Sequence, residues 1–157
     1  MIRTLICTAL CAFACSSTLA MSQDERKDFL NAIRPEASRQ AGQPVRFKVH
    51  TLNHEAGWAV LFGSLLAQEG QVMDWRKAKD CDPNLDKSLW VVAKKKGSNW
   101  TVVEMYICSP EPPYWYLEPE EAFARPCAIY AGLQASSDAT VEQECKAYQS
   151  ERRAKKK

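Results

Sequence analysis

The sequence holds His50 and His54, four residues apart, a spacing that suits a shared metal ion only on a helix. The neighbours of His50 alternate between apolar and charged residues, which predicts a strand. On a strand with a rise of about 3.3 Å per residue, the two rings would be about 13 Å apart, too far to share one ion. We therefore expect no metal site, no cofactor, and no Ser-His-Asp or Cys-His nucleophile.

Glu104 is the acidic residue with the clearest chemical potential. It lies in the middle of a predicted strand, where period-two alternation places it on one face with Trp100, Val102 and Tyr106. If that face lines a half-cone pocket, its aromatic neighbours would raise the pKa of the carboxyl and suit it to general acid–base catalysis. If the face meets water, Glu104 is an ordinary surface glutamate, which is the interpretation we favour.

The segment 110–116 (PEPPYWY) is the strongest candidate for recognition of a partner. Its three prolines lower the entropy cost of ordering the loop, and Tyr114, Trp115 and Tyr116 are of the residue types that dominate binding hot spots. The alternative is that one or two of these rings fold back onto the core, the usual position of an aromatic side chain.

The segment 67–87 lacks periodicity, and an irregular stretch of this length is either functional or tied down. Cys81 favours a covalent tie. The run 74–77 (DWRK), centred on Trp75, makes the same segment a second and weaker candidate for binding.

Residues 1–20 have the composition of a cleavable export signal, in which Arg3 precedes an uncharged apolar run and Ala20 marks the cleavage position. The apolar run is shorter than the roughly 20 residues that a membrane span needs. We therefore expect the mature chain to begin at Met21, to have no transmembrane segment, and to be periplasmic or secreted. The alternative is a lipid-modified cysteine at one of three positions, Cys7, Cys11 or Cys15.

Removal of the signal leaves four of the seven cysteines, an even number in an exported chain, which favours disulfides. None of them has the close CxxC spacing of a zinc or redox site. Among the three possible pairings we prefer Cys81 with Cys108 and Cys127 with Cys145, because each closes a loop of modest length, 27 and 18 residues. Each bond should stabilise the fold by about 3 kcal/mol.

A helix is predicted from Ser22, which forms a capping box with Glu25, to a stop at Gly42 and Pro44. Pro35 should kink this helix or divide it in two. Alternating or continuous apolar residues then predict four strands: from Val45, over 58–66, over 89–93 and over 100–108. The turn between the first two is expected over 53–57, and strand 58–66, apolar on both faces, should be covered on both sides.

The fold class that follows is α+β: an N-terminal kinked helix packed on a four-stranded antiparallel meander sheet, with short C-terminal helices. A short helix interrupted at Pro126 is expected over 118–130. The predicted organisation is a signal peptide over 1–20, one globular domain over 21–136, and a C-terminal helix with a basic tail over 137–157.

From Lys146 onward six cations face a single acid, which gives the tail a net charge of +5 and leaves the mature body at −4. Such a tail could contact an anionic membrane surface or an acidic partner. A solvated helix end explains it better, since cations in the last turn favour the helix dipole. The acidic body argues against nucleic acid.

Short motifs along 29–130 together resemble a family of small bacterial exported proteins. These motifs are AGQPV over 41–45, Gly57-Trp58-Ala59, Asp74-Trp75-Arg76, and the hairpin over 97–104 with Trp115 beyond it. The resemblance implies an exported location and a helix-backed sheet. The order of elements is also similar to the half-cone of cystatins and nuclear-transport-factor-like proteins. Neither likeness assigns an activity to any residue.

The sequence therefore predicts a non-catalytic exported protein that binds another protein, as inhibitors and immunity factors do. Its small size, paired cysteines and aromatic loop point this way. Two alternatives stay open: a small-ligand carrier or enzyme with a half-cone pocket around Glu104, and an envelope-associated structural protein that uses the basic tail.

Overall fold

The structure is a computed structural model that describes residues 21–69 and 71–156, so the predicted signal over 1–20 lies outside the described residues. The longer elements are α1 (Gln23–Ala41), β1 (Arg46–Glu55), β2 (Trp58–Leu66), β3 (Ser88–Lys96), β4 (Asn99–Ser109) and α3 (Val141–Ala154). The shorter helices are η1 (Trp75–Lys77), η2 (Pro113–Tyr116), α2 (Pro119–Ala122) and η3 (Cys127–Tyr130). The four strands form one antiparallel sheet in the order β1-β2-β3-β4, which confirms the predicted α+β fold with its helix before a meander.

Helix α1 begins and ends as its sequence predicts. The Ser22 hydroxyl accepts a hydrogen bond from the backbone N–H of Glu25 at 3.1 Å, and Gly42 closes the helix in the left-handed conformation at φ +64°. Pro35 lies inside α1, which continues undivided to Ala41, so of the two expected effects, a kink or a division, the division does not occur. An interior proline removes one intrahelical hydrogen bond, and α1 continues for six residues beyond Pro35 without it.

The C-terminal half of α1 carries an acid-sensitive ion pair. Hydrogen bonds from Arg39 and Gln40 to the carboxylate of Glu36 lower its pKa from the usual 4.5 to about 2. A carboxyl whose pKa is lower in the folded than in the unfolded chain stabilises the fold above pH 4.5, and this contribution is lost as the pH falls towards 2. NMR titration should therefore find a low Glu36 pKa in the wild type and a value nearer to 4.5 in Arg39→Gln. An Arg26→Gln control should leave the titration of Glu36 unchanged, and equal curves for all three proteins would contradict this assignment.

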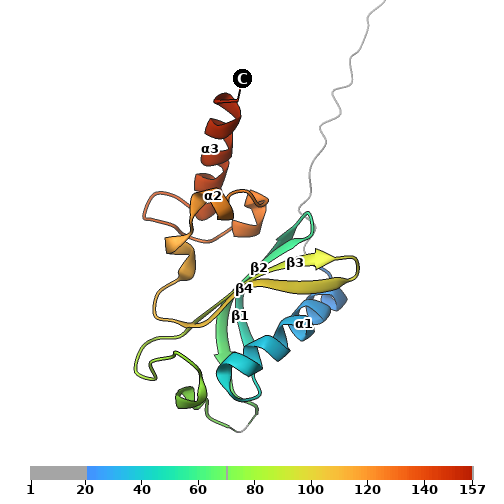
Figure 1. Ribbon diagram of the computed structural model, residues 1–157, viewed down its shortest axis with the longest axis vertical. Coiled ribbons are helices and arrows are strands. Elements are labelled where there is room, and N and C mark those ends of the chain that lie inside the picture. Colours follow the sequence, from blue (N-terminus) through green and yellow to red (C-terminus); the bar gives the residue numbers. More distant parts are fainter. Residues whose placement is uncertain (1–20, 70, 157) are drawn as a thin grey trace, which may run out of the picture.

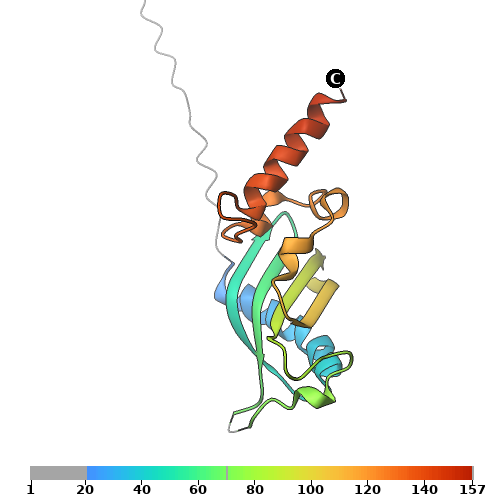
Figure 2. The same ribbon diagram turned by 90° about the vertical axis from the view of Figure 1, so that its left-hand side faces the viewer.

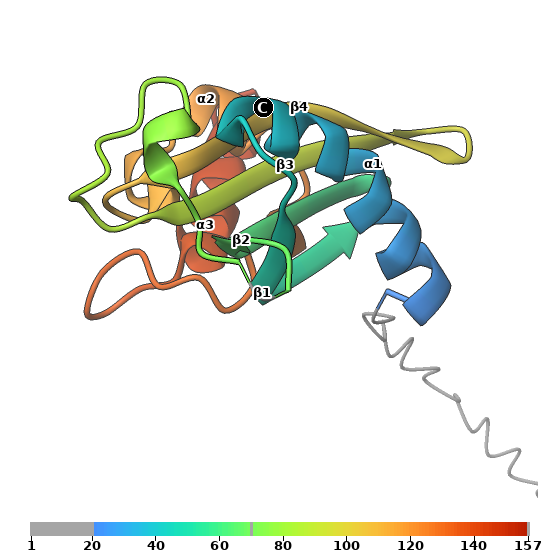
Figure 3. The same ribbon diagram turned by 90° about the horizontal axis from the view of Figure 1, so that it is seen from below.

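The sheet lies between two layers, as Figures 1 and 2 show. On one face, α1 packs Phe29, Ile33 and Ala37 against alternate residues of the strands, such as Leu61 and Val91. On the opposite face, the chain after β4 (residues 110–156), which we call the C-terminal layer, packs over a second cluster of buried residues, which includes Val60, Trp90, Val92, Ile129, Tyr130 and Val141. Strand β2 is therefore covered on both sides, as its apolar sequence predicts, and α1 and α3 lie on different sides of the sheet (Figure 3).

The hairpin between β1 and β2 is tighter than predicted. Strand β1 runs on to Glu55, and the turn consists only of Ala56 and Gly57, both at positive φ (47° and 76°), as a two-residue hairpin turn requires. Asn53, expected in the turn, lies in the strand instead. Its side-chain amide donates to the carbonyl oxygens of Ile129 (3.2 Å) and Ala131 (2.7 Å), which fixes the C-terminal layer to the sheet.

A β-bulge in β4 overturns one expectation about Glu104. Val92 pairs with Glu104 but the next residue, Ala93, pairs with Val102, so Val103 is an extra residue in β4. The extra residue reverses which side chains face which layer. Trp100 and Val102 pack on the α1 side, whereas Glu104 and Tyr106 line a pocket with Trp90 on the other side. The prediction that Glu104 shares a face with Trp100 and Val102 is wrong. The prediction that it shares a face with Tyr106 is correct.

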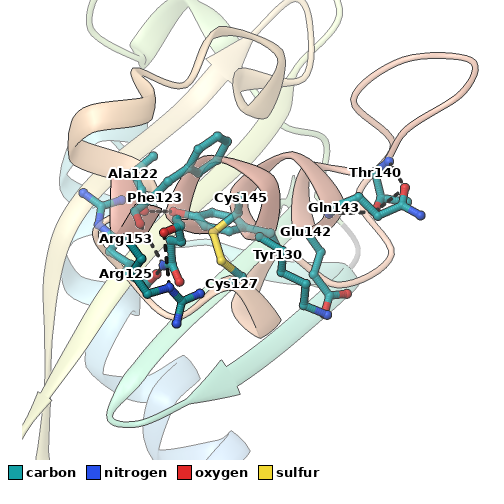
Figure 4. Close-up of a disulfide and its surroundings, with 12 residues drawn as sticks. Ala122, Phe123, Arg125, Cys127, Tyr130, Thr140, Glu142, Gln143, Cys145 and Arg153 are labelled. Carbon is teal, nitrogen blue, oxygen red and sulfur yellow. Dashed lines mark hydrogen bonds and ion pairs between the residues drawn. A yellow bond between two sulfur atoms is a disulfide. The ribbon is translucent and has the colours of Figure 1, made fainter. Parts of the chain in front are cut away.

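Both preferred disulfides are present. Cys81–Cys108 ties the irregular segment 67–87 to β4, and Cys127–Cys145 joins η3 to α3 within the C-terminal layer (Figure 4). Two disulfides fit a protein that is not cytoplasmic. Over residues 21–69 and 71–156, the structure contains no helix with the length and apolar character of a membrane span.

The last helix starts later than predicted, at Val141 instead of Ser137. Thr140 and Gln143 form a reciprocal capping box, in which the Thr140 backbone N–H donates to the Gln143 side chain at 2.9 Å. Residues before Thr140 form a turn that is closed by an isolated bridge between Gln134 and Thr140. The final turns of α3 project beyond the sheet (Figure 1), with Arg152, Arg153 and Lys155 exposed to solvent.

Candidate functional site

A pocket of about 360 Å³ opens on the sheet face opposite α1, between β4 and the chain that follows it. Its walls include the side chains of Trp90, Glu104, Tyr106, Tyr116, Glu118 and Glu121. The volume is at the low end of the range of ligand pockets, about 300 to 1,000 Å³. The pocket therefore has room for one small ligand or one long side chain.

Tyr114, the first ring of the predicted recognition segment, folds back onto the core. Its ring meets Phe62 edge-on at a centroid distance of 5.2 Å and lies 5.8 Å from Trp90. Burial raises the pKa of its hydroxyl. Tyr114 thus anchors helix η2 to the sheet, and the alternative that one ring of the segment caps the core holds for this residue.

Trp115 and Tyr116 stay on the surface, at 51% and 66% exposure. The indole N–H of Trp115 donates to the Gln134 carbonyl oxygen at 3.1 Å, and the Tyr116 hydroxyl donates to the carboxylate of Glu111, which raises the Tyr116 pKa. Both exposed rings are therefore held in place by hydrogen bonds. Together with Tyr106, which is 54% exposed and lines the same pocket as Tyr116, they form what we call the aromatic surface.

Arg125 is the one charged residue that is buried among residues 21–69 and 71–156, at 5% exposure, and it pairs with two carboxylates that line the pocket. Its guanidinium forms an ion pair with Glu104, reaches Glu121 at 3.4 Å, and stacks over the Trp58 ring at 5.3 Å (its place beside the disulfide is shown in Figure 4). Burial acts to lower the pKa of Arg125, but the hydrogen bond and the charge of Glu104 outweigh it, so the pKa is raised. Glu104, the residue of the catalytic alternative, therefore lines the pocket while it is paired with a buried cation.

The rim of the pocket is acidic. From Glu104 to Glu121 the sequence contains five glutamates and neither lysine nor arginine. Arg125 is paired with Glu104 and Glu121, whereas Glu118 lines the pocket without an ion pair to any described residue. The pocket therefore combines aromatic walls with excess negative charge.

A second hollow of about 460 Å³ lies across β4 from the first and shares Tyr106 and Ser109 with it. Its lining includes the cations Arg39 and Lys79 with Asp80. Tyr106 therefore stands between an acidic and a more basic hollow.

The structure does not bring the other candidates to this site. Trp75 packs against the cluster on the α1 face, with the Lys87 ammonium 5.6 Å from its ring centroid, and Asp74 caps η1. His50 is the extra residue of a bulge in β1 and meets the Phe62 ring at 5.7 Å. Within residues 21–69 and 71–156, no group of His, Cys, Asp and Glu side chains could hold a metal ion.

Sequence reasoning missed the part that Arg125, Glu118 and Glu121 play in the site. The spacing of four between Glu121 and Arg125 was the available signal, since residues four apart on a helical turn can pair. Nothing in the local pattern indicated that Arg125 also meets Glu104, 21 residues earlier in the chain.

No family model matches this chain, and no curated protein or solved structure is significantly similar to it. The resemblance to small bacterial exported proteins therefore stays a prediction. Function is argued below from the site itself.

Proposed function

We propose that this protein is a non-catalytic binding protein, periplasmic or secreted, that recognises another protein through the aromatic surface of Tyr106, Trp115 and Tyr116. The observation that carries the proposal is that Trp115 and Tyr116 are half exposed or more although hydrogen bonds fix both of them. A ring that a protein orders without burying it is available for contact with a partner.

The aromatic surface is already ordered in the free protein. Tyr114 packs against the buried residues of the second cluster, and the Trp115 backbone N–H donates to the carbonyl oxygen of Pro112, the residue before η2, at 3.0 Å. Binding therefore loses little conformational entropy, which is the main benefit of a preorganised surface. Tyrosine and tryptophan are also the types most enriched among residues that dominate binding energy.

The disulfides and the composition of residues 1–20 support the choice of a protein partner outside the cytoplasm. The two disulfides suit an oxidising compartment, and the leader-like composition of residues 1–20 agrees with it. A small, disulfide-stabilised domain with one aromatic surface and a salt-bridged Glu104 matches an inhibitor or immunity factor better than an enzyme.

Replacing both exposed rings, in Trp115→Ala/Tyr116→Ala, should weaken partner binding by at least about 30-fold, because hot-spot residues cost about 2 kcal/mol or more when truncated. The partner would be identified by cross-linking in periplasmic extract and mass spectrometry, then purified for interferometry with both proteins. Val72→Ala is the matched control, since Val72 is 91% exposed and lies outside the pocket.

Identical partner lists for the wild type and the double variant would remove the aromatic surface as the binding site. A small-ligand carrier is the second candidate, because the pocket exists and Glu104 lines it as that alternative required. A small molecule retained by the wild type in native mass spectra, together with identical partner lists, would replace the first proposal by the second.

A further inference from the structure

We propose that the pocket beside the aromatic surface receives a cationic side chain, an arginine or a lysine, of the partner protein. This inference rests on the proposed function and states the chemistry that the site selects. The partner would place its aromatic or aliphatic contacts on Trp115 and Tyr116 and insert the cation between Tyr106 and Glu118.

The charges of the lining favour a cation. Three carboxylates, those of Glu104, Glu118 and Glu121, line the pocket, and Arg125 supplies one guanidinium against them. The Arg125 guanidinium is directed to Glu104 and Glu121, so its charge does not compensate Glu118 directly. The pocket keeps a negative balance, and an anionic group would be repelled from it.

The aromatic walls favour the same ligand. Tyr106 and Tyr116 both line the pocket and both remain more than half exposed. A cation over a tyrosine ring gains about 0.5 to 1 kcal/mol at an exposed site and more when desolvated. A planar guanidinium can stack on one ring and donate two hydrogen bonds to a carboxylate at the same time.

Size and position fit a side chain presented by a protein. A volume of about 360 Å³ holds one long side chain, and the pocket adjoins Tyr116, the most exposed ring of the aromatic surface. The hollow across β4 is lined by Arg39, Lys79 and Asp80, with Arg39 paired to Glu36, so it lacks the negative excess of the pocket. Of the two hollows beside Tyr106, the pocket is therefore the one whose charge favours a cation.

The test is an NMR titration of the ¹⁵N-labelled protein with three probes at constant ionic strength: N-acetyl-arginine amide, N-acetyl-lysine amide and the uncharged N-acetyl-citrulline amide. We expect both cationic probes to shift the amide signals of Tyr106, Glu118 and Glu121 with dissociation constants of about 1 to 10 mM, a few kcal/mol of binding free energy. Citrulline should bind at least about tenfold more weakly.

Two variants locate the effect. Glu118→Gln, on the exposed rim, and Tyr106→Leu should each raise the dissociation constants of the cationic probes at least threefold. Glu144→Gln, at an exposed site on α3, should leave these constants unchanged. Dispersed spectra of each variant show that the fold is kept. Equal binding of citrulline, or equal loss with Glu144→Gln, would overturn the inference.

The two proposals fail separately. If the cationic probes do not bind but partner capture still depends on Trp115 and Tyr116, the cation pocket is wrong and the proposed function stands. If the Trp115→Ala/Tyr116→Ala variant captures the partner as well as the wild type does, the proposed function is wrong, whether or not the cationic probes bind. If the protein self-associates and truncation after Glu151 abolishes this, the ligand of the pocket is the basic tail of a second copy. That result would overturn the choice of a different partner protein.

Discussion

Replacement of Arg125 by methionine should lower the free energy of unfolding by about 3 kcal/mol, because breaking a buried ion pair leaves its partner charge uncompensated. Glu104 would lose its cation while its side chain is only 23% exposed, and the stacking on Trp58 would also be lost. Methionine keeps much of the apolar volume, so the cost measures the charge more than a cavity. Urea denaturation followed by tryptophan fluorescence gives the difference.

Removing both charges separates pairing from packing. Glu104→Gln/Arg125→Met should recover at least half of the lost stability, since neither partner is then left charged and unpaired. Arg26→Met is the control, because Arg26 is exposed on α1 and should change stability by less than about 0.5 kcal/mol. A cost below about 1 kcal/mol for Arg125→Met would show that water reaches Glu104 freely and that the ion pair is not a structural support of the pocket.

Local signals in the sequence were enough to predict most of the fold. Ser22 and Gly42 bound α1, the apolar alternation after Val45 marks β1, and the predicted strands over 89–93 and 100–108 lie within β3 and β4. Each of these features depends on residues within a few positions of one another. The cysteine pairing was also accessible, because loop length favours close partners along the chain.

The errors came from features that depend on distant partners. The bulge at Val103 is set by the pairing of β4 with β3, and one extra residue moved Glu104 to the opposite face of the sheet. The start of α3 was misplaced because the bridge between Gln134 and Thr140 occupies the residues before it. The alternation of apolar and polar residues along one strand does not reveal a bulge, because a bulge depends on which residues the neighbouring strand pairs with.

The candidate site shows the same division. Sequence composition singled out the aromatic segment, but only packing against Phe62 and Trp90 decides that Tyr114 is partly buried while its two neighbours stay exposed. The pocket itself is made by two parts of the chain, β4 and the segment around α2, that meet because the C-terminal layer folds back over the sheet. The Cys127–Cys145 disulfide lies within this C-terminal layer.

Loss of the Cys127–Cys145 disulfide, in Cys127→Ala/Cys145→Ala, should cost about 3 kcal/mol of stability and should open the C-terminal layer before the rest of the domain. This bond is the covalent link between η3 and α3. Besides it, α3 is attached by packing of Val141 and Cys145 in the second cluster and by hydrogen bonds from Gln149 to the carbonyl oxygens of Phe123 (2.9 Å) and Arg125 (3.0 Å). Hydrogen exchange should therefore rise most in α3 and η3, and partner binding should fall with it, because Arg125 and Glu121 would no longer shape the pocket.

The second disulfide supplies the matched comparison, since the chain-entropy model gives Cys81→Ala/Cys108→Ala a similar cost of about 3 kcal/mol. That bond ties the segment 67–87 to the end of β4 on the α1 side, where Cys81 and Cys108 pack with the first cluster. Its removal should leave exchange in α3 unchanged and most of the partner affinity intact. If both double variants lost binding equally, or if exchange rose uniformly after loss of Cys127–Cys145, the C-terminal layer would not be a separate unit and the disulfide would support the whole domain instead of the pocket.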